Sequence, residues 1–134
     1  MAVAPVYARS WPNGGRRMTG AMAVVYKITD ATLWRDATRA GIFRGSADDV
    51  RDGFIHLSTA AQIKETAAKH FAGIRDLLLV SIDADKLGDR LKWEPSRGGA
   101  LFPHLYGGLD LAAVIRVVPL PLAPDGTHRV PLLD

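Results

Sequence analysis

The segment Asp52–Gln62 reads Asp-Gly-Phe-Ile-His-Leu-Ser-Thr-Ala-Ala-Gln and determines how we interpret the rest of the chain. Its Asp-Gly pair is typical of a turn, because glycine accepts positive φ without steric cost. The apolar residues that follow favour a strand, and Thr59 with Gln62 three residues later is typical of a capping box. We therefore expect a strand that runs straight into a helix N-terminus, with His56 and Ser58 on one face. Ligands often bind at such a junction, where unpaired amides and the helix dipole converge.

Composition indicates one ordinary globular domain. The chain has 134 residues, of which 48% are hydrophobic and 23% are charged, and no window is long and apolar enough for a membrane span. It contains no cysteine, which excludes disulfides, a thiolate nucleophile and cysteine-ligated metal centres. We expect a soluble cytoplasmic protein without a membrane partner.

The excess of positive over negative charge lies in the N-terminal region. The net charge is +3 with a pI near 9.5, and Arg9, Arg16 and Arg17 account for the excess. From Met22 onward, 14 basic residues face all 14 acidic residues. We therefore expect no DNA binding. Residues 1–21 contain two prolines, three glycines and no periodic pattern, so they are expected to form a disordered or loosely packed tail before a single domain over 22–134.

Strands are expected to outnumber helices. One helix should begin at Thr29 or Asp30 and end at Gly41, and another should run from Thr59 to about Gly73. The apolar run 77–82 predicts a central strand covered on both faces. Further strands are expected at residues 23–28, 54–57, 91–94 and 112–119. Residues 44–49 are expected to form a turn-rich connection, and 96–108 a glycine-rich functional loop.

Two polar residues on strands are candidates for chemistry. Glu94 borders the predicted loop, where its carboxylate would accept a hydroxyl proton or stabilise a cationic transition state. The alternative for Glu94 is an ordinary ion pair with a nearby Lys or Arg. His56 lies in an otherwise apolar strand and is either a site residue or a hydrogen-bonded structural histidine.

The predicted loop adds further candidates. Arg97 beside two glycines is placed to meet a phosphate, and Tyr106 to stack on a nucleobase or nicotinamide ring. Trp93 is expected to pack in the core. A metal site built from His56, Glu94 and the loop residue His104 lacks any local ligand spacing, so no metal is expected. A serine hydrolase at Ser58 lacks an elbow motif.

In their order and spacing, several motifs closely resemble the bacterial domain-of-unknown-function 952 family, from about Tyr26 to Val118. The motifs are Gly41, Gly45-Ser46, Asp52 to Thr59, Gln62, Thr66-Ala67, His70-Phe71, Trp93-Glu94, Ser96-Arg97 and Phe102 to Gly107. That family is similar to the ADP-ribosyltransferase fold. The resemblance implies an α+β domain in which two small sheets and two main helices surround an NAD-binding cleft.

A second resemblance is to the RNA 2′-phosphotransferases of the same superfamily. It rests on Tyr26 to Thr29, Ala40 to Ile42 and His56 to Ser58. Lys27 stands where those enzymes carry a ribose-binding histidine, and Ile28 stands at a glycine position. The resemblance implies that the ligand is NAD or a related nucleotide.

Together these observations predict one polar cleft. If the protein is an enzyme, we expect an ADP-ribosyl- or phosphotransferase-like transferase, with Glu94 as the carboxylate and His56 or His104 orienting ribose hydroxyls. The remaining ligand contacts are assigned to Lys27, Ser58, Thr59, Arg97 and Tyr106. Two alternatives stay open. One is a noncatalytic module that binds a small anionic ligand or a protein, and the more distant one is a metal-dependent hydrolase.

Overall fold

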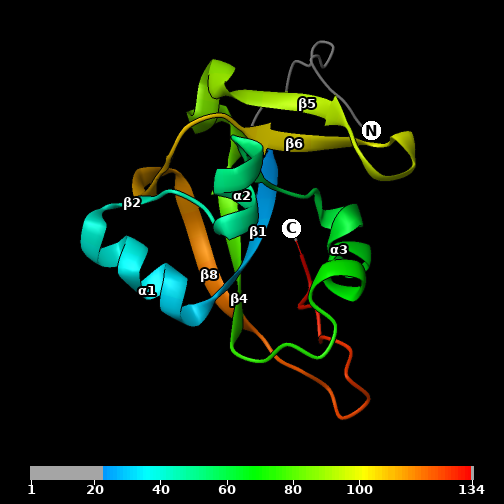
Figure 1. Cartoon of the computed structure of the whole chain (residues 1–134). Coiled ribbons are helices and arrows are strands. Elements are labelled where there is room, and N and C mark those ends of the chain that lie inside the picture. The colour runs from blue at the N-terminus through cyan, green and yellow to red at the C-terminus, as the bar shows by residue number, and fades with distance from the viewer. Residues whose placement is uncertain (1–22, 134) are drawn as a thin grey trace.

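The computed structural model describes residues 23–133, so the predicted tail over residues 1–21 lies outside the described residues. A three-stranded antiparallel sheet forms the centre, in the order β1 (Val24–Asp30), β4 (Leu77–Asp83), β8 (Val114–Leu120) (Figure 1). The predicted central strand is confirmed, because β4 lies between the other two and the Leu79 and Val80 side chains are fully buried. No helix within the described range is long and apolar enough to cross a membrane.

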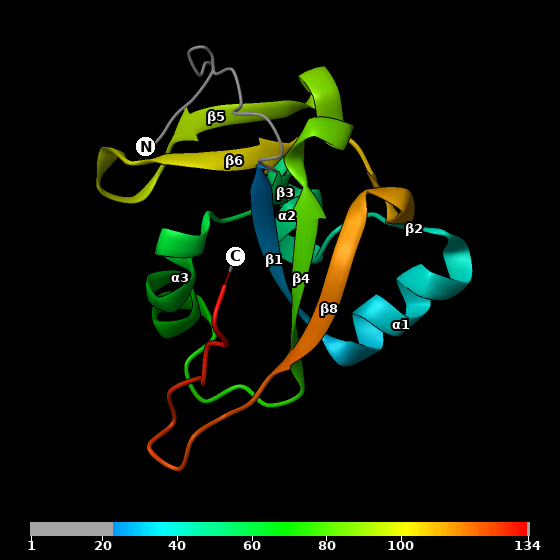
Figure 2. The ribbon, with the colours of Figure 1, turned by 180° about the vertical axis from the view of Figure 1, so that it is seen from behind.

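Helices α1 (Ala31–Ala40) and α3 (Ile63–His70) pack on opposite faces of this sheet (Figures 1 and 2). Asp30 caps α1 by accepting a hydrogen bond from the Leu33 backbone nitrogen at 2.7 Å, and Gly41 ends the helix at φ 82°. Before α3, the predicted pair of Thr59 and Gln62 forms a capping box. The predicted start of α1 is confirmed, whereas Thr59 precedes the 3₁₀ turn Ala60–Gln62 and α3 itself begins at Ile63.

The core has two parts because successive residues of β4 point to opposite faces. Val80 and Ile82 pack in the cluster that includes the buried side of α1, whereas Leu77 and Leu79 pack with α3. The C-terminal segment runs back beside α3 (Figure 2), where Val130 contacts the second cluster.

Two smaller sheets complete the fold. The larger has the order β3 (Ile55–His56), β6 (Leu101–Leu105), β5 (Leu91–Pro95), and it crosses one end of the central sheet (Figure 1). Strands β2 (Ile42–Phe43) and β7 (Leu109–Asp110) form the other. Short 3₁₀ helices occupy Ala60–Gln62, Ala84–Arg90, Arg97–Gly99 and Leu111–Ala113. The α+β class is confirmed, but the described chain has three sheets where two were predicted.

Two expectations about loops are wrong. The predicted turn over 44–49 contains the start of a third helix, α2 (Ala47–Asp52), capped by Ser46. The predicted loop over 96–108 contains strand β6 at Leu101–Leu105, so His104 lies on a strand and not in a loop. The glycines of this segment had favoured a loop, and a proline within a strand cannot donate a ladder hydrogen bond. In the structure the Pro103 carbonyl accepts from the Leu57 backbone nitrogen at 3.0 Å, and this contact needs no proline N–H.

Candidate functional site

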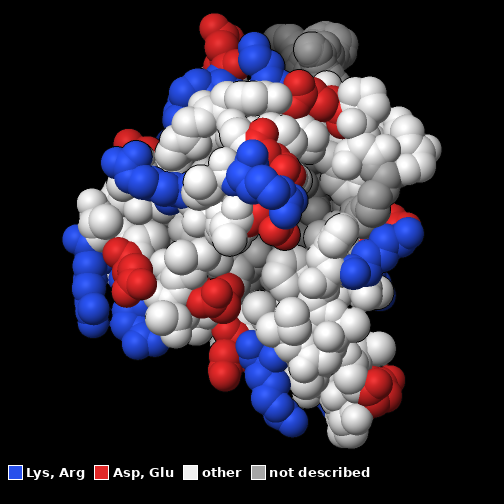
Figure 3. Space-filling model, viewed as in Figure 1, with Lys and Arg blue, Asp and Glu red and all other residues white. Residues whose placement is uncertain are grey.

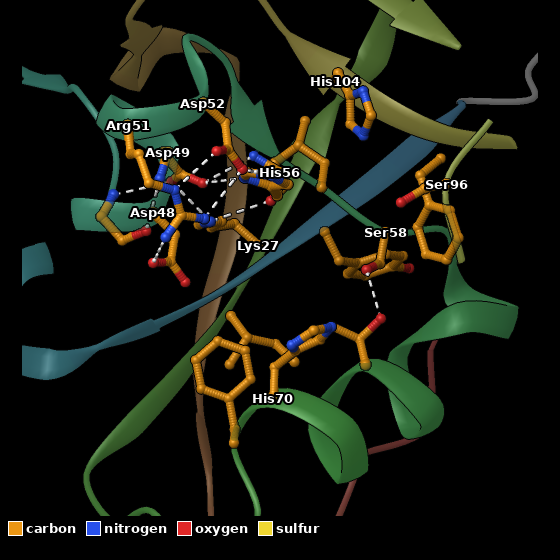
Figure 4. Close-up of a pocket in the computed structure, with 17 residues that line it drawn as sticks. Lys27, Asp48, Asp49, Arg51, Asp52, His56, Ser58, His70, Ser96 and His104 are labelled. Atoms are coloured by element: carbon orange, nitrogen blue, oxygen red, sulfur yellow. Dashed lines mark hydrogen bonds and ion pairs between the residues drawn. The ribbon is translucent and has the colours of Figure 1, made fainter. Parts of the chain in front are cut away.

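A cavity of about 270 Å³ opens between α3 on one side and α2 with β3 on the other (Figure 4). Strand β1 forms its floor, and β6 contributes a wall. Charged and polar lining residues are Lys27, Ser46, Asp48, Asp49, Arg51, Asp52, His56, Ser58, Thr66, His70, Ser96 and His104; Tyr26, Ile28, Leu57, Phe71 and Phe102 supply the less polar surface.

Asp49 is the centre of the most tightly bonded group in this cavity. Its Oδ2 lies 2.8 Å from Lys27 Nζ and accepts from the Ser46 backbone nitrogen at 2.9 Å. Its Oδ1 lies 2.6 Å from His56 Nδ1. The Asp49 side chain is 1% exposed. The local cause is the capping box of α2, in which Ser46 and Asp49 exchange hydrogen bonds and turn this carboxylate inward.

On the pKa of Asp49 and on that of Lys27, burial and the contacts within this group act in opposite directions. Burial alone would raise the pKa of Asp49, but the hydrogen bond from His56 and the charge of Lys27 outweigh it and hold the pKa well below its usual range. Burial lowers the pKa of Lys27, and the charge of Asp49 opposes that change. The ammonium group also donates to the His56 carbonyl at 3.1 Å.

His56 lies between two carboxylates. Its Nδ1 faces Asp49, and its Nε2 lies 2.9 Å from Asp52 Oδ2. Only a doubly protonated imidazole can donate to both carboxylates at once. On the outer side Arg51 bridges Asp48 and Asp52, and Figure 3 shows these charges gathered over α2.

A second group surrounds His104. Its Nδ1 lies 2.7 Å from Glu94 Oε1, and the Tyr106 hydroxyl donates to the same oxygen at 2.8 Å. The Phe54 ring stacks on the His104 ring with centroids 4.0 Å apart. His104 is also the direct cross-strand partner of His56, with ring centroids 5.7 Å apart. The two polar groups are therefore neighbours.

The pKa values of Glu94 and His104 in this second group are both lowered, which favours the ionised form of Glu94 and the neutral form of His104. Burial lowers the pKa of His104, which outweighs the stabilising effect of Glu94 on the imidazolium. The hydrogen bond from His104 has the largest effect on Glu94 and lowers its pKa, while desolvation acts in the opposite direction. The pair at neutral pH is therefore an ionised carboxylate and a neutral imidazole.

The structure brings only some of the predicted site residues to the cavity wall. Lys27, His56, Ser58 and His104 line it, and the Ser58 hydroxyl lies 3.1 Å from the Thr66 hydroxyl. Three predicted residues do not form the wall in this way. They are Glu94 and Tyr106, which contact His104 from outside the lining, and Thr59, whose role is to cap the Ala60–Gln62 turn.

Arg97 begins a short 3₁₀ helix over 97–99, and its backbone position is all that the structure describes. Asp49, Asp52, Thr66, His70 and Ser96 also line the cavity but were not predicted. A capping-box spacing from Ser46 to Asp49 was the available signal for the first of them. His70 was expected at the edge of the core, yet it is exposed. Within residues 23–133, no group of three or more histidine or acidic side chains is arranged to hold a metal ion.

This fold defines a small α+β domain with a polar cavity to which its central sheet and a smaller sheet both contribute. The chain belongs to the DUF952 family, described as a protein of unknown function, whose model matches residues 28–117.

Solved structures of protein CC0527 from Caulobacter crescentus are similar to this chain. The crystal structure is 49% identical with a TM-score of 0.77, covering 79% of this chain and 93% of that one. The solution NMR structure is 50% identical with a TM-score of 0.71, covering 79% and 91%. No curated protein matches the chain.

Proposed function

We propose that the cavity binds the nucleoside end of NAD or of a related nucleotide. The observation that carries this proposal is the pairing of hydroxyl and imidazole groups with flat apolar side chains in one cavity. The Ser58 and Thr66 hydroxyls both donate and accept, as ribose hydroxyls do, and Phe71 and Phe102 offer ring surface for a base. The resemblance of His56 to Ser58 to the phosphotransferase strand supports the same ligand class.

The size of the cavity indicates that it would enclose only a fragment of the dinucleotide. Its volume of about 270 Å³ lies just below the roughly 300–1,000 Å³ of sites that enclose a drug-sized ligand. The cations on its wall are already engaged, Lys27 by Asp49 and Arg51 by Asp48 and Asp52. The phosphates are therefore expected to lie outside the cavity, with the nucleoside inside.

The same resemblance leads us to propose an ADP-ribosyltransferase-like fold. In its support, the central sheet and the β3-β6-β5 sheet both contribute residues to the cavity, as expected for a cleft between two sheets. A noncatalytic binding module is the second candidate, favoured by the position of Glu94. A carboxylate that stabilises a cationic sugar must touch it, and Glu94 does not line the cavity.

The test is thermal shift and calorimetry with NAD, nicotinamide riboside, nicotinamide, ADP-ribose and inorganic phosphate. A ligand at a hundred times its dissociation constant adds about 2.7 kcal/mol of stability. NAD and the free riboside should both stabilise the protein. Ser58→Ala should weaken riboside binding about tenfold, as expected for one lost hydrogen bond. Thr32→Ala, at an exposed position on α1, is the matched control. Stabilisation by phosphate but by no nucleoside would contradict the proposal and favour a module for anionic ligands.

A further inference from the structure

The Glu94–His104 pair has the geometry that defines which imidazole nitrogen carries the proton. Glu94 Oε1 lies 2.7 Å from His104 Nδ1, and an ionised carboxylate can only accept a hydrogen bond. Nδ1 is therefore the protonated nitrogen of the neutral ring. The lone pair lies on the opposite nitrogen, Nε2.

That lone pair is directed toward the cavity. His104 lines the cavity, whereas Glu94, which occupies the Nδ1 side, does not. Figure 4 shows the His104 ring reaching from β6 into the space between His56 and Ser96. In the described part of the chain, no hydrogen bond is made to Nε2.

The ring is held in this orientation from several sides. Phe54 stacks on its face at 4.0 Å between centroids, and Tyr106 fixes the Glu94 oxygen that receives the Nδ1 proton. The neighbouring charges come from different elements: Glu94 on β5, His56 on β3 and Asp49 on α2. Glu94 and Asp49 favour the imidazolium and His56 opposes it, but burial has the largest effect and keeps the ring neutral.

We propose that His104 is a general base that activates water against the bound nucleotide, with Glu94 as its positioning residue. The inference rests on the proposed function. A water O–H proton passes to Nε2 while the oxygen forms a bond to the ribose carbon that carries the base. The bond from that carbon to the base nitrogen breaks, and the base leaves with the electron pair. For NAD the products are nicotinamide and ADP-ribose, and the proton on Nε2 then passes to solvent. This assignment differs from the sequence-based one, because the histidine performs the proton transfer and the carboxylate acts through it.

One arm of the test needs no ligand. Long-range nitrogen–proton NMR correlations on the full chain with labelled histidine report which ring nitrogen is protonated. At pH 7 we expect His104 as the neutral tautomer with the proton on Nδ1. A ring protonated on Nε2, or on both nitrogens, would overturn the inference whatever the ligand.

The second arm measures NAD binding by calorimetry and nicotinamide release by chromatography. His104→Gln should lower kcat by roughly 10²–10⁴-fold, the usual contribution of a general base, with little change in NAD affinity. Glu94→Gln should lower kcat and move the acid limb of the pH–rate profile to lower pH, because Glu94 raises the pKa of His104. A purely structural role would leave that limb in place. His128→Gln, whose ring contacts the Ile74 carbonyl away from the cavity, is the matched control.

The outcomes separate the two proposals. NAD binding without nicotinamide release, or an unchanged kcat in His104→Gln, would overturn the general base and leave the ligand site intact. Absence of NAD binding would overturn both.

Discussion

Asp49 contacts two nitrogens of His56 with the same carboxylate oxygen: Asp49 Oδ1 lies 2.6 Å from the ring Nδ1 of His56 and 3.0 Å from its backbone nitrogen. The same carboxylate accepts from the Ser46 backbone nitrogen and so belongs to the capping box of α2. One side chain therefore fixes a helix N-terminus and a strand residue of the cavity. Any change at Asp49 is expected to affect stability and site geometry together.

Asp49→Asn should destabilise the protein by about 3–5 kcal/mol, because it removes the charged partner of buried Lys27. The control is Asp48→Asn, since that carboxylate is 74% exposed and pairs with the exposed Arg51; its effect should stay within about 0.5 kcal/mol. Urea titration monitored by tryptophan fluorescence measures both. Equal effects at the two positions would contradict the importance of the buried pair.

The low pKa of Asp49 predicts acid sensitivity. Its folded-state pKa lies below its unfolded value of about 3.9, so its contribution is fully present above pH 4. This contribution is lost as the pH falls from the unfolded pKa toward the folded pKa, because in that range the Asp49 carboxylate takes up a proton in the unfolded state and stays ionised in the folded state. Between pH 4 and 2 the wild-type free energy of unfolding should therefore fall more steeply than that of Asp49→Asn. Parallel urea titrations at several pH values would reveal this, and identical slopes would argue against it.

Gly45→Ala should be more damaging than Gly53→Ala, although both glycines have positive φ, at 105° and 87°. A Cβ at Gly45 would lie 2.6 Å from the Asp49 Cβ and 2.9 Å from its Oδ2, whereas one at Gly53 meets nothing within 4 Å. Both variants carry the left-handed penalty of about 1–2 kcal/mol, and only Gly45→Ala must also displace Asp49. Denaturant titration should show the larger loss at Gly45, together with changed His56 NMR signals. A larger loss at Gly53 would contradict this account.

Leu79→Ala should cost about 2–5 kcal/mol, because this side chain is fully buried in the central strand and its removal leaves a cavity. Val117→Ala, on the neighbouring edge strand β8, is the control, since Val117 is 37% exposed. Its effect should be much smaller. Differential scanning calorimetry can rank the two, and a near-neutral Leu79→Ala would mean that β4 is not the centre of the core.

Much of the fold could be predicted because its signals are local. Asp30 and Gly41 mark the ends of α1 through one hydrogen bond and one backbone conformation, both encoded within a few residues. The run over 77–82 is apolar on both faces, which only a central strand explains. The site was partly predictable for the same reason, since His56 and Ser58 stand out in an apolar strand.

Other features depend on contacts between distant segments. Helix α2 has six residues and buries only Asp49, so it has no apolar stripe to reveal it. The third sheet arises because β2 pairs with β7, which is more than sixty residues later in the chain. Glu94 was expected in the cavity because it borders the glycine-rich segment. Its separation from the cavity by the His104 ring depends on the β5-β6 register, which the composition of either strand alone does not specify.

The order of the central sheet has a consequence for how the chain folds. Strand β4 is flanked by β1, near the start of the described chain, and by β8, near its end. The sheet therefore cannot form from hairpins of consecutive strands. The β1–β4 and β4–β8 pairings must each bring together residues separated by roughly 30 positions or more. A high contact order slows the search for the native arrangement. During synthesis, β1 and β4 can meet on the ribosome, but the apolar side chains of β4 stay without their second neighbour until β8 has emerged.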